Sequence, residues 1–396
     1  MMTGRLLARI VLLPLLSCTL LLGGCWDRNE INDLAIVLAT GVDWTDGEVE
    51  LAAQIFVPRG GAGEGGAPAE SASGVTLIRT AQGTTIAEAL NRLQRQVSRE
   101  MFWGHCEVIV ISEEAGQQGL REYIDFFLRY PQFREHAYVF SSKGKAKELL
   151  ALLDPLERNS AESLREMAIL GLGARVTVLD LAKGIKGPSE TVILSRLLVS
   201  PSTHTEQSSI VNSPTVNGLS LYNRGYYVKT VKEPLSLGVL MLANELNNII
   251  LQVEVAGIPG IFSVRPHKIE ARLKPAIRED KWSMTINIET KGEVVLNTTN
   301  ASLAKQQVMA AVEQAWEEEM KLLAEQAIQL AQDELHADLF QFAVKFRRHY
   351  PRQWKAQEAQ WDDIFSKLEV QVTAHAKITG SGKSTTPQGI PGSENK

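Results

Sequence analysis

Cys25 is the residue of this sequence whose neighbours point most specifically to one reaction. It directly follows the tripeptide L-G-G at 22–24. Upstream, residues 1–9 carry two arginines and no acid, and residues 10–22 form an apolar run of about thirteen residues. A run of that length is typical of a signal peptide, because a bilayer-spanning helix needs roughly 20 residues. The ending L-G-G-C is typical of a bacterial lipobox, where the cysteine thiol takes a diacylglyceryl group and cleavage makes it the new N-terminus.

We therefore predict a lipoprotein signal peptide at 1–24 and lipid attachment at Cys25. The alternative is an ordinary secretion signal with a chance cysteine at its end. Two or more acyl chains hold a protein stably on a membrane, whereas one binds only marginally. The anchor should keep the mature chain on the outer face of the cytoplasmic membrane. Trp26 and Asp27 come next and lie closest to the bilayer, so they are candidates for contact with a partner. Packing of Trp26 on its own domain is an equally open alternative.

Other patterns of reactive residues are weak. G-S-G-K-S-T at 380–385 lacks the first glycine and the following helix of a phosphate-binding loop. G-x-G-x-x-G at 61–66 is followed by proline and serine instead of an apolar helix. The histidines show no metal-ligand spacing; in the nearest cluster, 105–107, neighbours on a strand would point to opposite faces. We predict no catalytic residue, no cofactor and no metal site.

The net charge limits the kind of binding partner, and the cysteine content limits what can stabilise the fold. The chain has 41 basic and 46 acidic residues, a net charge of −5, and no run of lysine or arginine. This balance argues against nucleic acid as a partner, because such binding depends on a basic patch. Of the three cysteines, Cys18 would be lost with the signal peptide and Cys25 acylated. Cys106 alone cannot form an internal disulfide, so the fold must depend on its apolar core.

Hydrophobic periodicity predicts a mixed α/β domain at 25–200. Residues 34–38 and 49–57 read as strands joined by a turn at 45–47, where glycine supplies a positive φ. Residues 58–74, rich in glycine, predict a mobile loop. Strands and helices then alternate, which implies parallel pairing with right-handed crossovers. The predicted helices are 84–100, 117–130, 145–153 and 159–173, and the predicted strands 75–80, 108–111, 135–141 and 191–199.

The second half of the chain predicts a different architecture. Residues 201–262 read as a middle β-rich domain or connection, including a hairpin at 215–231. Residues 263–379 predict an antiparallel sheet packed on a long helix at 302–336, capped by Thr299 or Asn300. Its stripe of Val312, Trp316, Met320 and others recurs at spacings of three and four, which favours core packing over a coiled coil. Residues 380–396 read as a disordered tail. The fold class is α+β with mixed α/β, in several domains.

Three stretches of this sequence resemble one family along the whole mature chain. The first is G-C-W-D-R-N-E-I at 24–31, followed by G-V-D at 41–43. The second is R-Y-P-Q-F-R at 129–134. The third is D-L-F-Q-F at 338–342, continued by aromatic residues at 350–365. These motifs resemble the Ger(x)C family, the C-subunit lipoproteins of nutrient germinant receptors in endospore-forming bacteria. The glycine-rich loop after residue 58 departs from the family's pattern.

The resemblance implies a receptor subunit rather than an enzyme. Such a lipoprotein would lie on the outer face of the spore inner membrane, beside a transporter-like membrane subunit and a second membrane subunit. Together they would couple detection of a nutrient to ion and dipicolinate release. Direct binding of the germinant by this subunit stays open. A solute-binding lipoprotein of a transporter is the alternative function, and it would require two similar α/β lobes around a cleft.

Overall fold

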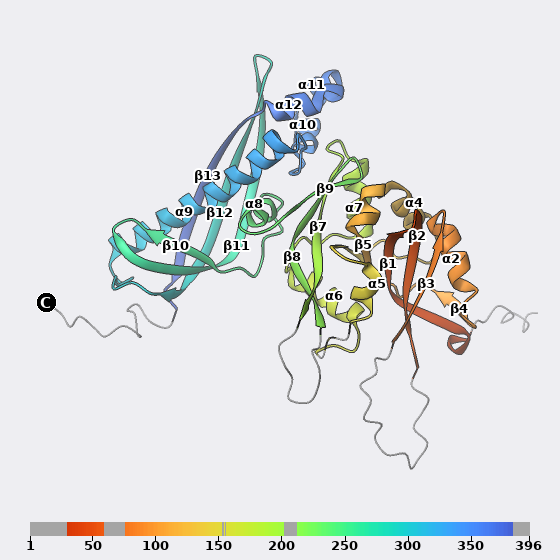
Figure 1. Cartoon of the computed structure of the whole chain (residues 1–396). Coiled ribbons are helices and arrows are strands. Elements are labelled where there is room, and N and C mark those ends of the chain that lie inside the picture. The colour runs from red at the N-terminus through yellow and green to blue at the C-terminus, as the bar shows by residue number, and fades with distance from the viewer. Residues whose placement is uncertain (1–29, 59–75, 153, 155, 202–211, 383–396) are drawn as a thin grey trace, which may run out of the picture.

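The computed structural model describes residues 30–58, 76–152, 154, 156–201 and 212–382. The predicted signal peptide, most of the predicted mobile loop and the tail after residue 382 lie outside the described residues. The chain forms two lobes, each built on its own β-sheet (Figure 1). This confirms the predicted α+β class, with an N-terminal mixed domain and a C-terminal sheet that carries a long helix.

The first lobe is organised around a nine-stranded sheet in the order β3-β2-β1-β5-β6-β7-β8-β9, with β4 paired to β1. Strands β1, β5, β6 and β7 run parallel in the centre, and the flanking pairs are antiparallel. The wholly apolar strand predicted at 108–111 is the buried centre of this sheet, as expected for a strand covered on both faces. The strands are β1 (Leu34–Thr45), β2 (Glu48–Phe56), β3 (Thr76–Gly83), β4 (Glu100–Phe102), β5 (Val108–Ser112), β6 (Tyr138–Ser142), β7 (Thr191–Pro201), β8 (Asn212–Asn223) and β9 (Tyr226–Val231).

The helices that connect these strands are shorter than the periodicity predicted. The predicted helix 117–130 is two helices, because Gly119 has φ +110° and interrupts the helical backbone. The predicted helix 84–100 already ends at Gln94. The single turn η1 is Ile31–Asp33, and the helices are α2 (Ile86–Gln94), α3 (Glu113–Gln118), α4 (Arg121–Arg129), α5 (Ala146–Leu150), α6 (Ser160–Leu170) and α7 (Val178–Lys186).

Residues 201–262 do not form a sheet of their own. Strands β8 and β9 extend the first sheet, because β8 pairs with β7 along almost its whole length. The helix α8 (Leu235–Leu242) and the strand β10 (Leu251–Val255) belong to the second lobe. A Cβ at Gly238 would lie 2.1 Å from the Leu323 carbonyl oxygen, so α8 lies against the long helix at this glycine. The region predicted as a middle domain is therefore divided between the two lobes.

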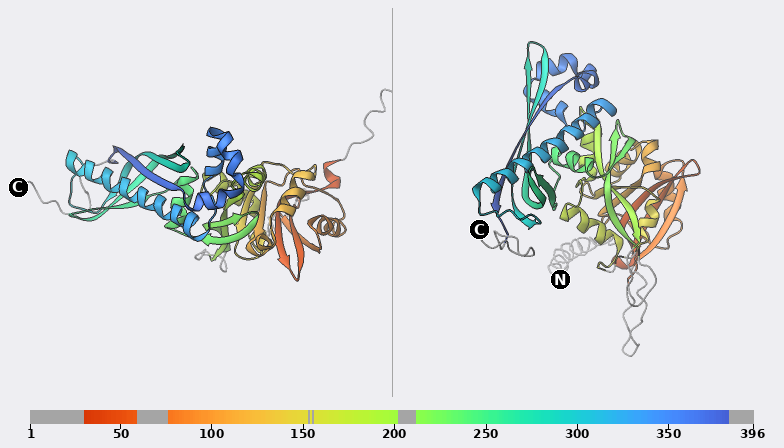
Figure 2. Two further views of the ribbon diagram at one scale, coloured as in Figure 1. Left: turned by 90° about the horizontal axis from the view of Figure 1, so that it is seen from above. Right: turned by 60° about the vertical axis from the view of Figure 1, so that its left-hand side comes forward.

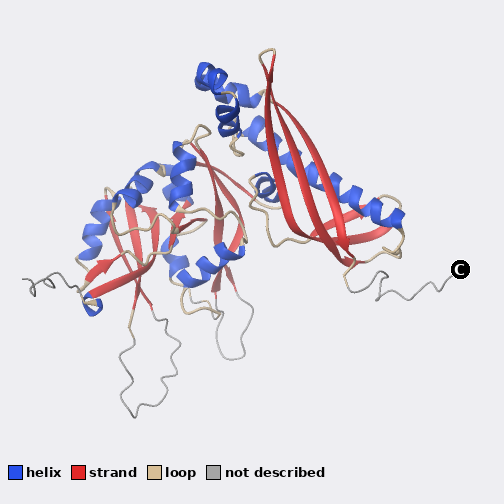
Figure 3. Ribbon diagram, turned by 180° about the vertical axis from the view of Figure 1, so that it is seen from behind, coloured by secondary structure: helices blue, strands red, loops and turns tan. Residues whose placement is uncertain are grey.

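The second lobe is a four-stranded sheet in the order β10-β11-β12-β13, with the long helix α9 (Gln306–Gln329) along one face (Figure 3). Strands β11 (Ile258–Arg278) and β12 (Lys281–Asn297) form a long hairpin. Strand β13 (Glu369–Gly380) joins β12 in parallel, because the helices between them return the chain to the starting end. The sheet is thus antiparallel only up to β12. Gly380, expected in the tail, is the last residue of this strand.

The apolar stripe of α9 is core, as the spacing predicted: Val312, Trp316 and Met320 are fully buried. The helix is shorter than 302–336 and begins after Lys305. Thr299 does not cap it, since its hydroxyl accepts a bond from Ala301 N in an earlier turn. A π-helical turn, η2 (Leu330–Glu334), ends it. On this helix the carboxylates of Glu313 and Glu317 accept bonds from the β13 amides of Ile378 and Ala376, respectively.

The remaining helices gather the aromatic residues of the third motif. They are α10 (Phe342–His349), α11 (Pro351–Gln357), η3 (Glu358–Gln360) and α12 (Trp361–Ser366). Pro351 begins α11 rather than merely ending α10, as its fixed φ and missing N–H allow. The two lobes lie side by side (Figure 2), and one apolar cluster includes β8 residues of the first lobe with the core of the second. In the part of the chain that the structure describes, no helix is long and apolar enough to cross a membrane.

Candidate functional site

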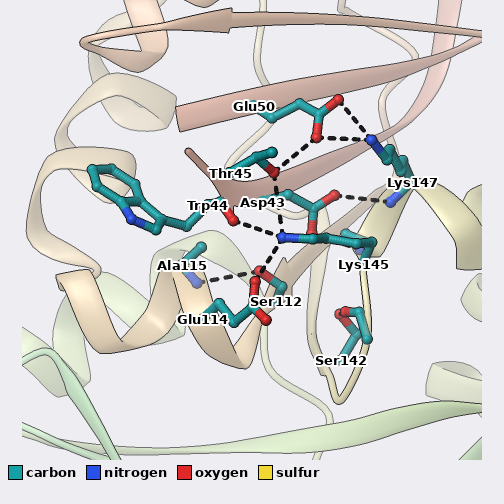
Figure 4. A network of polar contacts seen from close by, with 12 residues as sticks. Asp43, Trp44, Thr45, Glu50, Ser112, Glu114, Ala115, Ser142, Lys145 and Lys147 are labelled. Atoms are coloured by element: carbon teal, nitrogen blue, oxygen red, sulfur yellow. Dashed lines mark hydrogen bonds and ion pairs between the residues drawn. The ribbon is translucent and has the colours of Figure 1, made fainter. Parts of the chain in front are cut away.

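The carboxyl ends of parallel strands are where α/β proteins usually bind ligands. In this chain that edge carries Asp43 near the end of β1, Ser112 at the end of β5 and Ser142 at the end of β6. Figure 4 shows these side chains around Lys145, which lies just before α5. The edge is therefore the first place to look for a functional site.

Asp43 is fully buried and holds the start of α5. Its carboxylate accepts bonds from Ala146 N at 2.7 Å and Lys147 N at 3.1 Å. Burial raises the pKa of Asp43, although these two amides favour the charged form. Gly41 lies two residues earlier, and a Cβ there would lie 3.0 Å from the Ala146 Cβ. The G-V-D motif thus lets α5 approach β1 and then caps it.

Two lysines complete this network, and each forms an ion pair with a glutamate. Lys145 Nζ donates to the Trp44 carbonyl oxygen at 2.6 Å and pairs with Glu114 at 2.6 Å. Lys147 Nζ pairs with Glu50 at 2.8 Å, and the Glu50 side chain is only 6% exposed. Burial works against the charge on Glu50, but the bond and attraction of Lys147 outweigh it, so the pKa of Glu50 is lowered.

A second buried network lies at the same edge, towards β7 and β8. The Arg196 Nε lies 2.7 Å from a Glu113 carboxylate oxygen, and both side chains are largely buried. Ser220 and Thr230 donate to the same oxygen. The negative charge of Glu113 is therefore paired within the fold, and its carboxylate oxygen also accepts hydrogen bonds there, as buried ion pairs require.

These groups bind one another rather than leave a reactive group open. Each charged side chain of the two networks has an oppositely charged or amide partner inside the fold. Cys106 is buried, and burial raises the pKa of its thiol to about 12, so it is not a thiolate at neutral pH. The described residues hold no group of three or more metal-ligating side chains. The arrangement can position helices, and we assign it that structural role.

The third motif joins the two lobes. The buried carboxylate of Asp338 accepts bonds from Phe342 N at 2.9 Å and Ala343 N at 2.7 Å, which caps α10. It also accepts a bond from Ser189 Oγ at 2.7 Å, and its main-chain oxygen accepts one from Thr191 Oγ1 at 2.6 Å. Both donors lie at the start of β7. Burial raises the pKa of Asp338, although these hydrogen-bond donors favour its charged form.

The sequence-predicted site residues Cys25, Trp26 and Asp27 lie outside the described residues. The described chain begins at residue 30, and Ile31 in η1, directly before β1, is 76% exposed. Sequence reasoning missed Ser189, Thr191 and Lys145. The first two are hydroxyl residues 147 or more positions from Asp338, so no local spacing could connect them.

Two family models match consecutive parts of the chain. One, described as "Spore germination protein N-terminal domain", matches residues 27–198, and one described as "Spore germination B3/ GerAC like, C-terminal" matches residues 217–382. The second match begins inside β8, so the two parts meet within the first sheet. Together they span most of the sequence.

Similar proteins agree with this assignment. "Putative spore germination protein YfkR" of Bacillus subtilis (strain 168) is 28% identical over 93% of this chain and 96% of its own length. "Spore germination protein KC" of the same organism is 24% identical over 96% and 97%. The "Crystal Structure of the GerBC protein" superposes with a TM-score of 0.55 at 16% identity, covering 86% of this chain and 97% of that one. The last likeness concerns the fold alone.

The fold and these matches define a two-lobed spore germination protein. The chain belongs to the Ger(x)C family, the C subunits of nutrient germinant receptors.

Proposed function

We propose that this chain is the lipid-anchored subunit of a nutrient germinant receptor. It is held through Cys25 on the outer face of the spore inner membrane. It contacts the transporter-like and second membrane subunits and keeps them in a signalling-competent assembly. It works through protein contact and not through catalysis.

The observation that carries this proposal is the match of both family models over 27–198 and 217–382. The internal use of the charged groups at the sheet edge supports a scaffold rather than an enzyme. The rival function, solute capture for a transporter, required two similar α/β lobes. The lobes differ here, one with a nine-stranded mixed sheet and one with a four-stranded sheet and a long helix.

Replacing Cys25 with alanine tests the anchor. Spores that produce Cys25→Ala should carry the protein uncleaved and unlabelled by an alkyne fatty acid, and should respond poorly to nutrients. Cys106→Ala is the matched control, because that thiol is fully buried and bonded to the Val108 carbonyl oxygen. Fatty-acid label on the Cys25→Ala protein would contradict lipid attachment at this residue.

A pull-down of the tagged protein from spore inner membrane tests the assembly. Two membrane proteins, one resembling a multi-span transporter, should be recovered with it. Recovery of a transport ATPase with its permease instead would favour solute capture.

A further inference from the structure

A cavity of about 140 Å³ lies where the two lobes meet. One wall is the end of α6 with residues 171–173, and a second is the part of β8 at 216–219. The other walls are α8 and residues 246–249, which lead to β10 in the second lobe. A ligand in this cavity would therefore contact both lobes at once.

The cavity has aliphatic walls and polar groups that mainly accept hydrogen bonds. The walls are Leu172, Leu219, Leu237, Leu240, Leu246 and Ile249. The polar lining contains Glu233 and the amides of Asn247 and Asn248, and no lysine, arginine or histidine is among its described residues. The two amide NH₂ groups donate to the main-chain oxygens of Glu245 and Leu170, which leaves their carbonyl oxygens as acceptors.

Ser236 lines the cavity with an unused hydroxyl. The residue is only 3% exposed, and no hydrogen bond joins its Oγ to any residue that the structure describes. As Ser236 is a lining residue, its hydroxyl can bond a ligand or ordered water in the cavity.

A β-bulge shapes the wall on the β8 side. Leu197 pairs with Val216 and Ser195 with Leu219, so two β8 residues, Asn217 and Gly218, oppose one residue of β7. Gly218 has φ +84°, and a Cβ there would lie 2.2 Å from the Val231 carbonyl oxygen. Bulges of this kind are frequent beside binding sites, where they turn a strand away from its neighbour.

We propose that this cavity binds a small aliphatic ammonium compound. The alkyl group lies among the leucines, and the ammonium donates to Ser236 Oγ, the asparagine carbonyl oxygens and the Glu233 carboxylate. An anion is disfavoured because no cation lines the cavity. A cavity of ~150 Å³ holds benzene, so a four-carbon amine fits. This inference goes beyond the function proposed above and does not depend on it.

Binding of isobutylammonium to the full chain, purified in detergent, tests the proposal. Calorimetry and saturation-transfer NMR should give a Kd of about 1 mM, a reasonable value for so small a ligand. Isobutyrate, which has the same alkyl group with the opposite charge, should bind at least tenfold more weakly. Absence of saturable binding, or equal binding of the two ions, would overturn the proposal.

Two substitutions locate the site. Glu233→Gln should weaken isobutylammonium binding about fivefold, and Ser236→Ala should weaken it as well. Glu358→Gln is the matched control, an exposed glutamate in η3 of the second lobe, and should bind like the unchanged protein. All three should keep the melting temperature of the parent. Unchanged binding in both Glu233→Gln and Ser236→Ala would place the ligand elsewhere and refute the assignment.

Discussion

At the scale of single residues, the described G-V-D motif and the Asp338 motif that carry the family resemblance contribute contacts that hold the fold. Gly41 lets α5 approach β1, and Asp43 then caps that helix. Asp338 caps α10 and holds the start of β7. The observed role of both aspartates is therefore structural, since each carboxylate is used to hold a helix.

Removing the Asp43 carboxylate should destabilise the first lobe. In Asp43→Ala the amides of Ala146 and Lys147 lose their acceptor in a buried place, which should cost about 2 kcal/mol of unfolding free energy. Denaturant unfolding followed by circular dichroism measures this cost. Asp43→Asn is the matched control, because its carbonyl oxygen can still accept, and it should lose less. An alanine variant as stable as the parent would show that the cap contributes nothing.

The Glu50–Lys147 pair should make the stability depend on pH. The pKa of Glu50 is lower folded than unfolded, so the pair stabilises above the unfolded pKa, about 4.3, and that contribution is lost as pH falls through the folded value. Lys147→Met should therefore lower the stability at pH 7 and flatten its decline between about pH 5 and 3. Lys321→Met, in an exposed pair with Glu325, should change neither. If the unfolding free energy of Lys147→Met fell with decreasing pH as steeply as that of the parent, this account would be contradicted.

Some residue roles can be predicted from neighbours in the sequence, and others cannot. The chemistry expected of Cys25 follows from its immediate neighbours, and the turn at 45–47 from its glycine, which has φ +85°. The amides that Asp43 binds, and the hydroxyls of Ser189 and Thr191 that donate to Asp338, lie about a hundred or more positions away and become neighbours only when the sheet forms. Spacing in the sequence could not reveal these long-range contacts, whereas the cap of α10 by Asp338 joins residues only four and five positions apart.

At the scale of elements, hydrophobic periodicity located the buried faces of helices and strands better than it located their ends. The stripe on α9 was correct because its apolar residues face the sheet, whereas its start was displaced when Thr299 bonded within its own turn. The parallel pairing of β13 could not be read locally, since alternation is the same in either direction. Glu313 and Glu317 blunt the open edge of β13, which would otherwise offer free amides to another strand.

Trp316→Ala tests whether the stripe of α9 is core. The side chain is fully buried, and its loss should cost about 3–5 kcal/mol, seen as a large fall in melting temperature. Leu322→Ala on the same helix is the control, because Leu322 is 48% exposed and its loss should matter little. Unchanged stability of Trp316→Ala, together with lost partner recovery in the pull-down, would instead make the stripe an interface.

At the scale of the whole molecule, the two lobes are joined by polar contacts and by a shared apolar cluster. Asp338 holds Ser189 and Thr191, and Arg224 pairs with Asp362 across the same junction. The sequence predicted two different architectures in the correct order. It placed the boundary near residue 200 because the stretch that follows is rich in serine and threonine, whereas β8 pairs with β7 on the far side of it.

The final prediction concerns how the anchored end takes part in signalling. Five extended residues reach no more than about 17 Å, so Trp26 and Asp27 stay near the lipid when Cys25 is acylated. An aromatic ring beside a charge at that depth suits contact with a membrane subunit. Spores with Trp26→Ala and Asp27→Ala should keep the protein anchored at normal level yet germinate poorly with nutrients. They should germinate normally with added dipicolinate, which bypasses the receptor. Asp363→Ala, an exposed acid of the second lobe, should leave the nutrient response intact. A normal nutrient response in the double variant would remove this segment from the mechanism and leave the contact with the membrane subunits to the folded lobes.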